Sequence, residues 1–375
     1  MRKLITGLAR RLRRLPGRDD RGVIGVLVAV LFGGGVLLGM GALVIDAGQI
    51  YQNRAELQNG ADAAALAVAR SCALGSCTPS IAARYATANA SKLTGGAAGV
   101  DLVCGSGSLG ACPASSGAIT DCPAAPGAGS NFVDVHTSTR TSSGSSLLPP
   151  AFAGTLLGNS GFQGTTVKAC AQVGWGAPAA MTGLALTISA CAWDQATNLG
   201  TTFAAPPPYP PNVLPSPSLD HALALHGRSS ATGCSTEPEG ADAPGNFGWT
   251  TDSTGACQIY ENGSTYGGNP GTSASRACET ALSADQASRT LVFLPVYVSV
   301  SGRGSDAAYT LKGFAAFVVT GYHLPGFSAS DWLDAANNCT GPRFCVNGYF
   351  TQGIIPDTGS LGGPDLGAVV VELTG

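Results

Sequence analysis

The feature that most constrains this 375-residue chain is a stretch without charged residues, residues 22–45, that directly follows a basic tail. The stretch has 24 residues, of which 14 are Val, Leu, Ile or Phe, and it ends before Asp46. A helix of this length rises about 36 Å, more than the hydrocarbon core of a bilayer, which is about 30 Å thick. The sequence therefore predicts a transmembrane helix over residues 22–45.

The charge distribution predicts the orientation of this helix. Residues 1–21 have a net charge of +6, whereas residues 46–375 have a net charge of −9. Because basic flanks stay on the cytoplasmic side, residues 1–21 are expected to be a cytoplasmic tail and the rest an extracytoplasmic ectodomain of a single-pass protein of the cell membrane. The acidic ectodomain argues against nucleic-acid binding.

A cleaved secretory signal is the alternative interpretation of the N-terminus. It shares the basic start and the apolar run, but its apolar core is normally 7–15 residues long and ends in a small-x-small cleavage site. The run in this chain is longer, and no A-x-A site precedes Asp46.

Cysteine usage agrees with export. All 12 cysteines lie after residue 71, and an even set confined to the exported part is typical of disulfides formed in an oxidising compartment. Spacing alone does not fix connectivity. The bridges expected from proximity along the chain are Cys72–Cys77, Cys170–Cys191, Cys257–Cys278 and Cys339–Cys345.

The predicted fold class is α+β, with a long N-terminal helix, a helical hairpin and a β-rich, disulfide-bonded ectodomain. One continuous helix is expected from about residue 22 to 71, because apolar residues recur on one face and residues 61–70 are rich in Ala and Leu. Gly60 is a weak point in this helix, and Gly75 marks its end. A second helix, capped by Thr78 and started by Pro79, is expected to reach Gly95 and to complete a hairpin over residues 46–96.

Beyond residue 96 the pattern changes to strands. Abundant glycine (53 residues) and a charged fraction of only 11% favour β structure with long loops. Residues 206–217 contain seven prolines, so they form a linker or loop between a β-rich section, 97–205, and a cysteine-containing β-rich section, 218–375. The expected strands are 131–140, 165–175, 184–192, 291–301, 309–322 and 367–373.

The N-terminal region resembles a known family. The quoted features are Arg21-Gly22, the apolar run, Asp46-x-Gly48, and the segment from Gln58-Asn59 through Ala61-Asp62-Ala63-Ala64-Ala65-Leu66-Ala67. As a set they resemble the N-terminal domain of TadG-like proteins of bacterial Tad (Flp) pilus-assembly systems. The resemblance covers about 50 residues and implies a membrane-anchored structural or assembly component whose partners are the membrane and other proteins of the pilus or secretion apparatus.

Two features of relatives are not expected here. A Glu five residues after the cut, as in pseudopilins, would fall at Leu27, so processing by a prepilin peptidase is not predicted. The nearest approach to a D-x-S-x-S metal motif, Asp252-Ser253-Thr254-Gly255, has the wrong spacing, so no von Willebrand A-type domain is predicted.

No catalytic chemistry is predicted. Residues 105–110 match G-x-G-x-x-G, but Pro113 and the residues after it exclude the helix that a dinucleotide site needs. His221 and His226 are five residues apart, not the four that a helical metal pair requires, and there is no G-x-S-x-G motif. The sequence therefore predicts no enzyme, cofactor, metal or small-molecule substrate.

Two surfaces are candidates for assembly. Gly35 and Gly39 form a small-xxx-small pair through which membrane helices could approach, although glycine is common in such helices anyway. The second candidate is the small-residue face of the exported helix, which could receive a partner helix or could pack inside the chain. Its residues are Ala61, Ala64, Ala65 and Val68, with Asp62 on the flank. Two functions stay open: a Tad-type assembly component, or a membrane-anchored adhesin or binding module.

Overall fold

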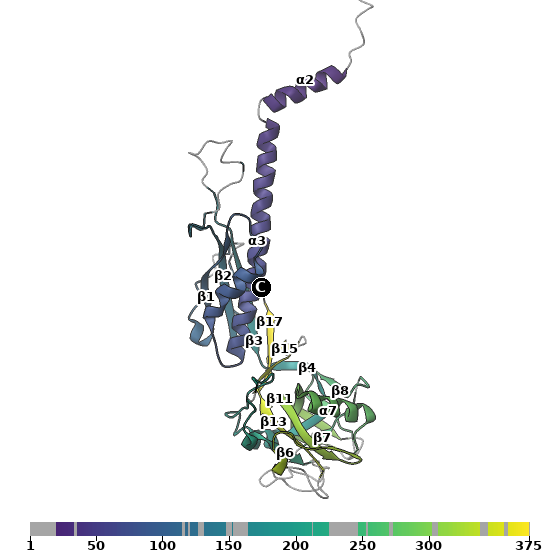
Figure 1. Ribbon diagram of the computed structural model, residues 1–375. Helices are drawn as coiled ribbons and strands as arrows, with labels where there is room; N and C mark the ends of the chain where they lie inside the picture. The colour runs from purple at the N-terminus through teal and green to yellow at the C-terminus, as the bar shows by residue number, and fades with distance from the viewer. Residues whose placement is uncertain are drawn as a thin grey trace, which may run out of the picture. The chain divides into compact units, whose positions relative to one another are not determined.

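The computed structural model describes residues 20–33, 36–114, 117–118, 121–126, 131–147, 152, 164–211, 213–224, 247–252, 254–269, 273–301, 307–337, 344–355 and 359–374 (Figure 1). The chain divides into two compact units. The first consists of Met1–Gly60, Ala86–Gly99 and Thr137–Ala169, and the second of Ala61–Tyr85, Val100–His136 and Cys170–Gly375. The described residues of the proline-rich segment 206–217 therefore lie within the second unit.

The described residues of the N-terminal region form the helices α2 (Asp20–Gly33) and α3 (Val36–Ala73). Residues 34 and 35, over which one continuous helix was predicted, lie outside the described residues. In the described part of the chain, none of the helices combines the length and the apolar character that a membrane crossing needs. Helix α3 ends as expected, since Gly75 has φ +79°.

Gly60 is essential for helix packing in the first unit rather than simply a weak point of α3. A Cβ at this position would lie 2.8 Å from the carbonyl oxygen of Ala86 and 3.1 Å from the Cβ of Ala90. Ala86 belongs to α4 (Ala82–Asn89), which follows the short helix η1 (Pro79–Ile81). The second helix of the predicted hairpin therefore ends at Asn89, before the expected Gly95.

A five-stranded sheet has the order β1-β2-β3-β17-β14 among the described strands. Their bounds are β1 Ala97–Gly105, β2 Asn131–Arg140, β3 Lys168–Gly176, β17 Ala368–Leu373 and β14 Gly353–Ile354. Strand β17 runs antiparallel to β3, with Val371 opposite Trp175. The alternation of side chains along residues 131–140 predicted β2 with the observed bounds.

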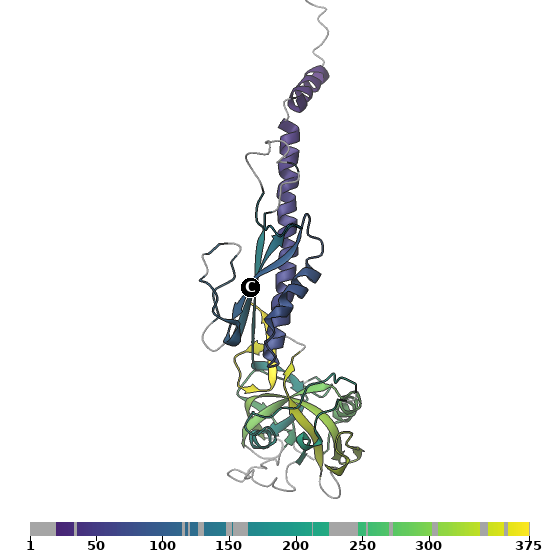
Figure 2. The same ribbon diagram turned by 60° about the vertical axis from the view of Figure 1, so that its left-hand side comes forward.

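The second unit contains a larger sheet built around two long antiparallel strands, β10 (Leu291–Ser301) and β11 (Ala308–Leu324) (Figure 2). The order of the described strands is β6-β13-β11-β10-β5-β7, and β9, β12 and β16 also pair with β11. The bounds are β5 Leu186–Ser189, β6 His221–Ala224, β7 Phe247–Trp249, β9 Thr265–Gly267, β12 Phe327–Ala329, β13 Cys345–Thr351 and β16 Asp365–Leu366. A small sheet has the order β15 (Ser360–Leu361), β4 (Pro178–Leu184), β8 (Gln258–Glu261).

Two short helices complete the core of this unit. Trp193 of α6 (Ala190–Ala196) and Leu282 of α7 (Arg276–Ser288) are buried in one cluster with Leu294 and Phe317 of the sheet. The strand expected over 184–192 ends at Ser189, because the Ser189 side chain accepts the backbone N–H of Ala192 and starts α6.

The disulfides agree with two predicted pairings and correct a third. Cys72–Cys77 and Cys257–Cys278 are bridged, as expected. Cys170 pairs with Cys122 rather than with Cys191, because the segment 121–126 brings Cys122 against β3 while Cys191 lies in α6. A further bridge joins Cys104 and Cys112. Cys191 and Cys345 are also disulfide-bonded, and Cys339, the predicted partner of Cys345, lies outside the described residues.

The close approach at Gly60 generates a stability prediction. Gly60→Leu is expected to destabilise the chain by about 1–3 kcal/mol, because the added side chain must push the Ala86 backbone away. Gly48→Ala, in the same helix with no atom within 4 Å of the added Cβ, is the matched control and is expected to be neutral or slightly stabilising. Denaturant unfolding of the purified chain measures both, and equal midpoints would contradict the account.

Candidate functional site

Helix α3 has two differently exposed parts, and α2 continues the first of them. Ten large apolar residues of α2 and of the first turns of α3 are between 40% and 69% exposed. Clustered exposure of this kind is characteristic of surfaces that bind another protein or a lipid phase. These residues are Ile24, Val26, Leu27, Val28, Val30, Phe32, Met40, Leu43, Val44 and Ile45.

Polar contacts fix α3 where the exposed apolar run has ended. Asp46 Oδ1 accepts the backbone N–H of Phe152 at 3.0 Å. Asn53 is fully buried, and its side-chain amide both donates to the carbonyl oxygen of Thr94 at 3.2 Å and accepts the N–H of Thr94 at 2.9 Å. Thr137 of β2 donates to the carbonyl oxygen of Leu57 at 3.3 Å. These contacts lie within the first unit and hold the helix to the strand and the loop beside it.

The small-residue face of α3 is an internal surface. Ala61, Ala64, Ala65 and Val68 have no exposed area, and Asp62 is only partly buried beside them. Other parts of the same chain therefore cover these residues, which favours the second of the two interpretations, packing inside the chain. Of the proposed membrane-helix pair, Gly39 has no atom within 4 Å of an added Cβ, and Gly35 lies outside the described residues.

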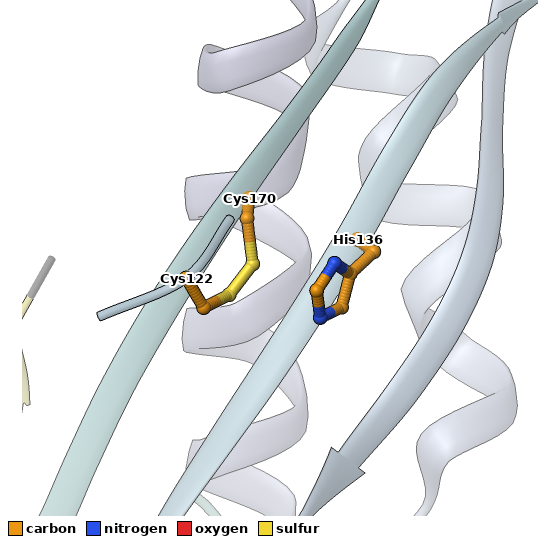
Figure 3. Close-up of side chains that lie close together, drawn as sticks. All are labelled: Cys122, His136 and Cys170. Atoms are coloured by element: carbon orange, nitrogen blue, oxygen red, sulfur yellow. A yellow bond between two sulfur atoms is a disulfide. The ribbon is translucent and has the colours of Figure 1, made fainter. Parts of the chain in front are cut away.

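Asp134 and His136 of β2 occupy strand positions that alternate with Thr137. They form a polar cluster with cysteines of three neighbouring segments. Figure 3 shows the Cys122–Cys170 disulfide beside the imidazole of His136. The sulfurs of this bridge and a ring nitrogen of His136 lie within 4.8 Å of one another, and so do the Cys104 sulfur, a carboxylate oxygen of Asp134 and a ring nitrogen of His136. No sequence pattern indicated this cluster, because its members come from four separate segments.

The chemistry of this cluster is limited by its oxidation state. Metal ions bind cysteine as the thiolate, and both cysteine pairs here are bonded as disulfides. The ligand atoms that remain are those of Asp134 and His136. One oxygen of Asp134 is buried without a hydrogen-bond partner. Burial raises the pKa of Asp134, and a hydrogen bond with Gln172 and the charge of His136 oppose this rise only in part.

Two loops that resembled ligand sites are structural. The glycine-rich residues 105–110 close on themselves through a 2.8 Å hydrogen bond from the N–H of Gly105 to the carbonyl oxygen of Gly110, next to the Cys104–Cys112 bridge. Asp252 accepts backbone N–H groups of Thr254, Gly255 and Cys257 at 2.8–3.0 Å. Burial would raise the pKa of Asp252, but these hydrogen bonds outweigh it and lower the pKa below its ordinary value.

The burial of the α3 face generates a prediction about Ala64. Ala64→Arg is expected to destabilise the fold by about 3–5 kcal/mol, because it places an unpaired charge in a closed interior. Ala55→Arg, on an exposed position of the same helix, is the matched control and is expected to be tolerated. Limited proteolysis of both variants measures the difference. An Ala64→Arg variant as resistant as Ala55→Arg would show that the face is open.

Comparison with known proteins gives one match, and it falls on these helices. Residues 22–71 match the family model of Flp pilus-assembly, TadE/G-like sequences. No curated protein and no solved structure matches the chain. The matched residues begin in α2 and end two residues before the end of α3, so the match includes both the exposed apolar run and the buried small-residue face. Residues 22–71 are therefore similar to Flp pilus-assembly, TadE/G-like sequences, as the resemblance of the N-terminal region predicted.

Proposed function

We propose that this chain is a membrane-anchored structural component of a Tad (Flp) type pilus or tight-adherence secretion apparatus, with its N-terminus in the cytoplasm and its disulfide-bonded part outside. The observation that carries the proposal is the position of the family match on α2 and α3. The role in assembly is a property of the family, and the membrane anchor is an inference from the residues of this chain.

The exposed apolar residues support the anchor. Ten large apolar side chains between Ile24 and Ile45 face outward, and exposure to water of so many would be unfavourable by about 1.5–3 kcal/mol for each side chain left unburied. A bilayer would cover all of them at once. The basic tail before them and the acidic chain after them agree with an N-terminus inside. The bridges Cys72–Cys77 and Cys257–Cys278 agree with an oxidising exterior.

The binding-module alternative rests on a different observation. The second unit has a pocket of about 660 Å³, lined by Leu184, Leu291, Phe293 and Ile355 together with the polar groups of Gln258 and Asp285. A mainly apolar pocket with a few polar groups is the usual form of a small-ligand site. This alternative expects the second unit to act without the apparatus, whereas the main proposal expects the chain to be retained in it.

The anchor is tested by charge substitution at the exposed positions. Val30→Arg combined with Phe32→Arg is expected to release the chain from membranes washed with alkaline carbonate, because each arginine costs about 3 kcal/mol in a bilayer centre. Tyr51→Arg, at an exposed position beyond Asp46, is the matched control and is expected to stay in the membrane pellet. A wild-type chain that the carbonate wash extracts would refute the anchor.

Affinity purification of the wild-type chain from mild detergent extracts then tests the role. Co-purification with pilus or secretion-apparatus proteins is expected for an assembly component. A chain that is anchored and folded but purifies alone would favour the binding module.

A further inference from the structure

Two buried carboxyl groups of the second unit meet at one threonine. Strand β11 has a bulge at Thr320, since its register against β13 passes from Val319 opposite Gly348 to Gly321 opposite Asn347. Thr320 is fully buried, and its Oγ1 lies 2.7 Å from Oδ1 of Asp220 and 3.1 Å from Oδ2 of Asp331. The two aspartates are only 7% and 6% exposed.

The number of available hydrogen atoms is too small for two ionised carboxylates. A threonine hydroxyl has one hydrogen, so Thr320 can donate to only one of the two aspartates. A hydrogen bond that joins the second aspartate to this group, whether to Thr320 or to the other aspartate, therefore needs a hydrogen on a carboxyl group. Bringing two carboxylates together without that hydrogen would also place like charges in a poorly hydrated interior, which strongly favours protonation of one of them.

The surroundings indicate which aspartate is ionised. Oδ1 of Asp331 accepts the backbone N–H groups of Leu333 at 2.8 Å and Asp334 at 2.9 Å, and its Oδ2 accepts the side-chain N–H of Asn347 at 2.7 Å. Burial would raise the pKa of Asp331, but the hydrogen bonds from Asp220 and from these donors outweigh it and hold the pKa below its ordinary value. Asp331 is therefore the carboxylate, and the proton lies on Asp220.

We propose that Asp220 and Asp331 share one proton at neutral pH and form a pH-sensitive clamp. The clamp joins the residue before β6 and the turn 331–334 to the bulge of β11. Loss of the proton leaves two adjacent buried negative charges, which repel each other and release these segments from β11.

The neighbouring charges modulate the clamp. Arg289, at the end of α7, lies over the ring of Trp332, the residue after Asp331, with its guanidinium 4.3 Å from the ring centre; a positive charge in this region opposes retention of the proton. Helix α7 is held to the bulge by Gln286, which donates to the carbonyl oxygen of Thr320 at 3.0 Å. Burial lowers the pKa of His221, so that this side chain is neutral at pH 7. Other titratable groups on the elements around the pair include Tyr209, Asp285, Tyr322, His323, Asp334 and Tyr349.

The sign of the pH effect follows from the proton count. The folded chain holds a proton that an aspartate of the unfolded chain, with a pKa of about 3.9, has lost at neutral pH. Stabilisation by the clamp is therefore complete below about pH 4 and disappears as the pH rises and the folded pair loses its proton. Over that interval the clamp raises the unfolding equilibrium constant about tenfold for each pH unit.

Asp220→Asn tests the clamp, with Asp334→Asn as the matched control. The asparagine keeps a neutral donor at position 220 but takes up no proton. The unfolding equilibrium constant of the purified full chain is followed by tryptophan fluorescence from about pH 5 to 8. As long as the wild type keeps its proton, this constant should rise about tenfold less per pH unit in Asp220→Asn than in the wild type. Asp334→Asn, which can still accept the N–H of Ala336, should keep the wild-type slope.

Two results would overturn the proposal. One is an identical slope in the wild type and Asp220→Asn. The other, which does not depend on any variant, is an infrared spectrum of the wild type at neutral pH without the carbonyl band of a protonated carboxyl group. If that band is absent and a chelator destabilises the wild type, a divalent cation occupies the pair instead of a proton.

Discussion

The surroundings of α3 change along its length, and the packing of the N-terminal region depends on this change. Apolar side chains face outward as far as Ile45, and from Asn53 onward one face of the helix is closed by the chain itself. The closed face is built from alanines and valine, and Gly60 lets the backbone of α4 approach within contact distance. Small residues allow this approach because no larger side chain stands between the two backbones, which can therefore reach van der Waals contact.

In this arrangement one part of α3 presents apolar side chains outward, and another part packs inside the chain. The buried face cannot be offered to a partner without opening the fold, since a polar network around Asn53 and Thr94 fixes the loop beside it. Under the proposed function, contacts with the apparatus are therefore expected from exposed surfaces of the chain, and the family match covers both the exposed apolar residues and the buried face of α3. The polar cluster at His136 contributes covalent cross-links and no free thiolate.

Local patterns in the sequence were sufficient for several elements. Strands β2 and β10 have the predicted bounds because alternating or β-branched residues determine them locally. The end of α3 near Gly75 and the short-range bridge Cys72–Cys77 are local in the same sense. Helix α7 was missed, although Ser275 before it is a good N-cap and accepts the N–H of Cys278.

Features that join distant segments could not be predicted. Cys122 and Cys170 are 48 residues apart, and Asp220 lies 100 residues before Thr320. The face at Ala64 could not be assigned from the sequence for a related reason: a stripe of small residues has the same sequence pattern whether its partner is another protein or the same chain.

The most direct test of the central claim is the environment of α2 and α3 on the two sides of Asp46. Nitroxide-bearing residues can be introduced at Leu27, Val44 and Ala55, which are all exposed, so that labelling disturbs no packing. In liposomes, spin relaxation at Leu27 and Val44 should respond to oxygen, which concentrates in lipid, and relaxation at Ala55 to a water-soluble nickel complex. Equal access of the nickel complex to all three positions would contradict the account.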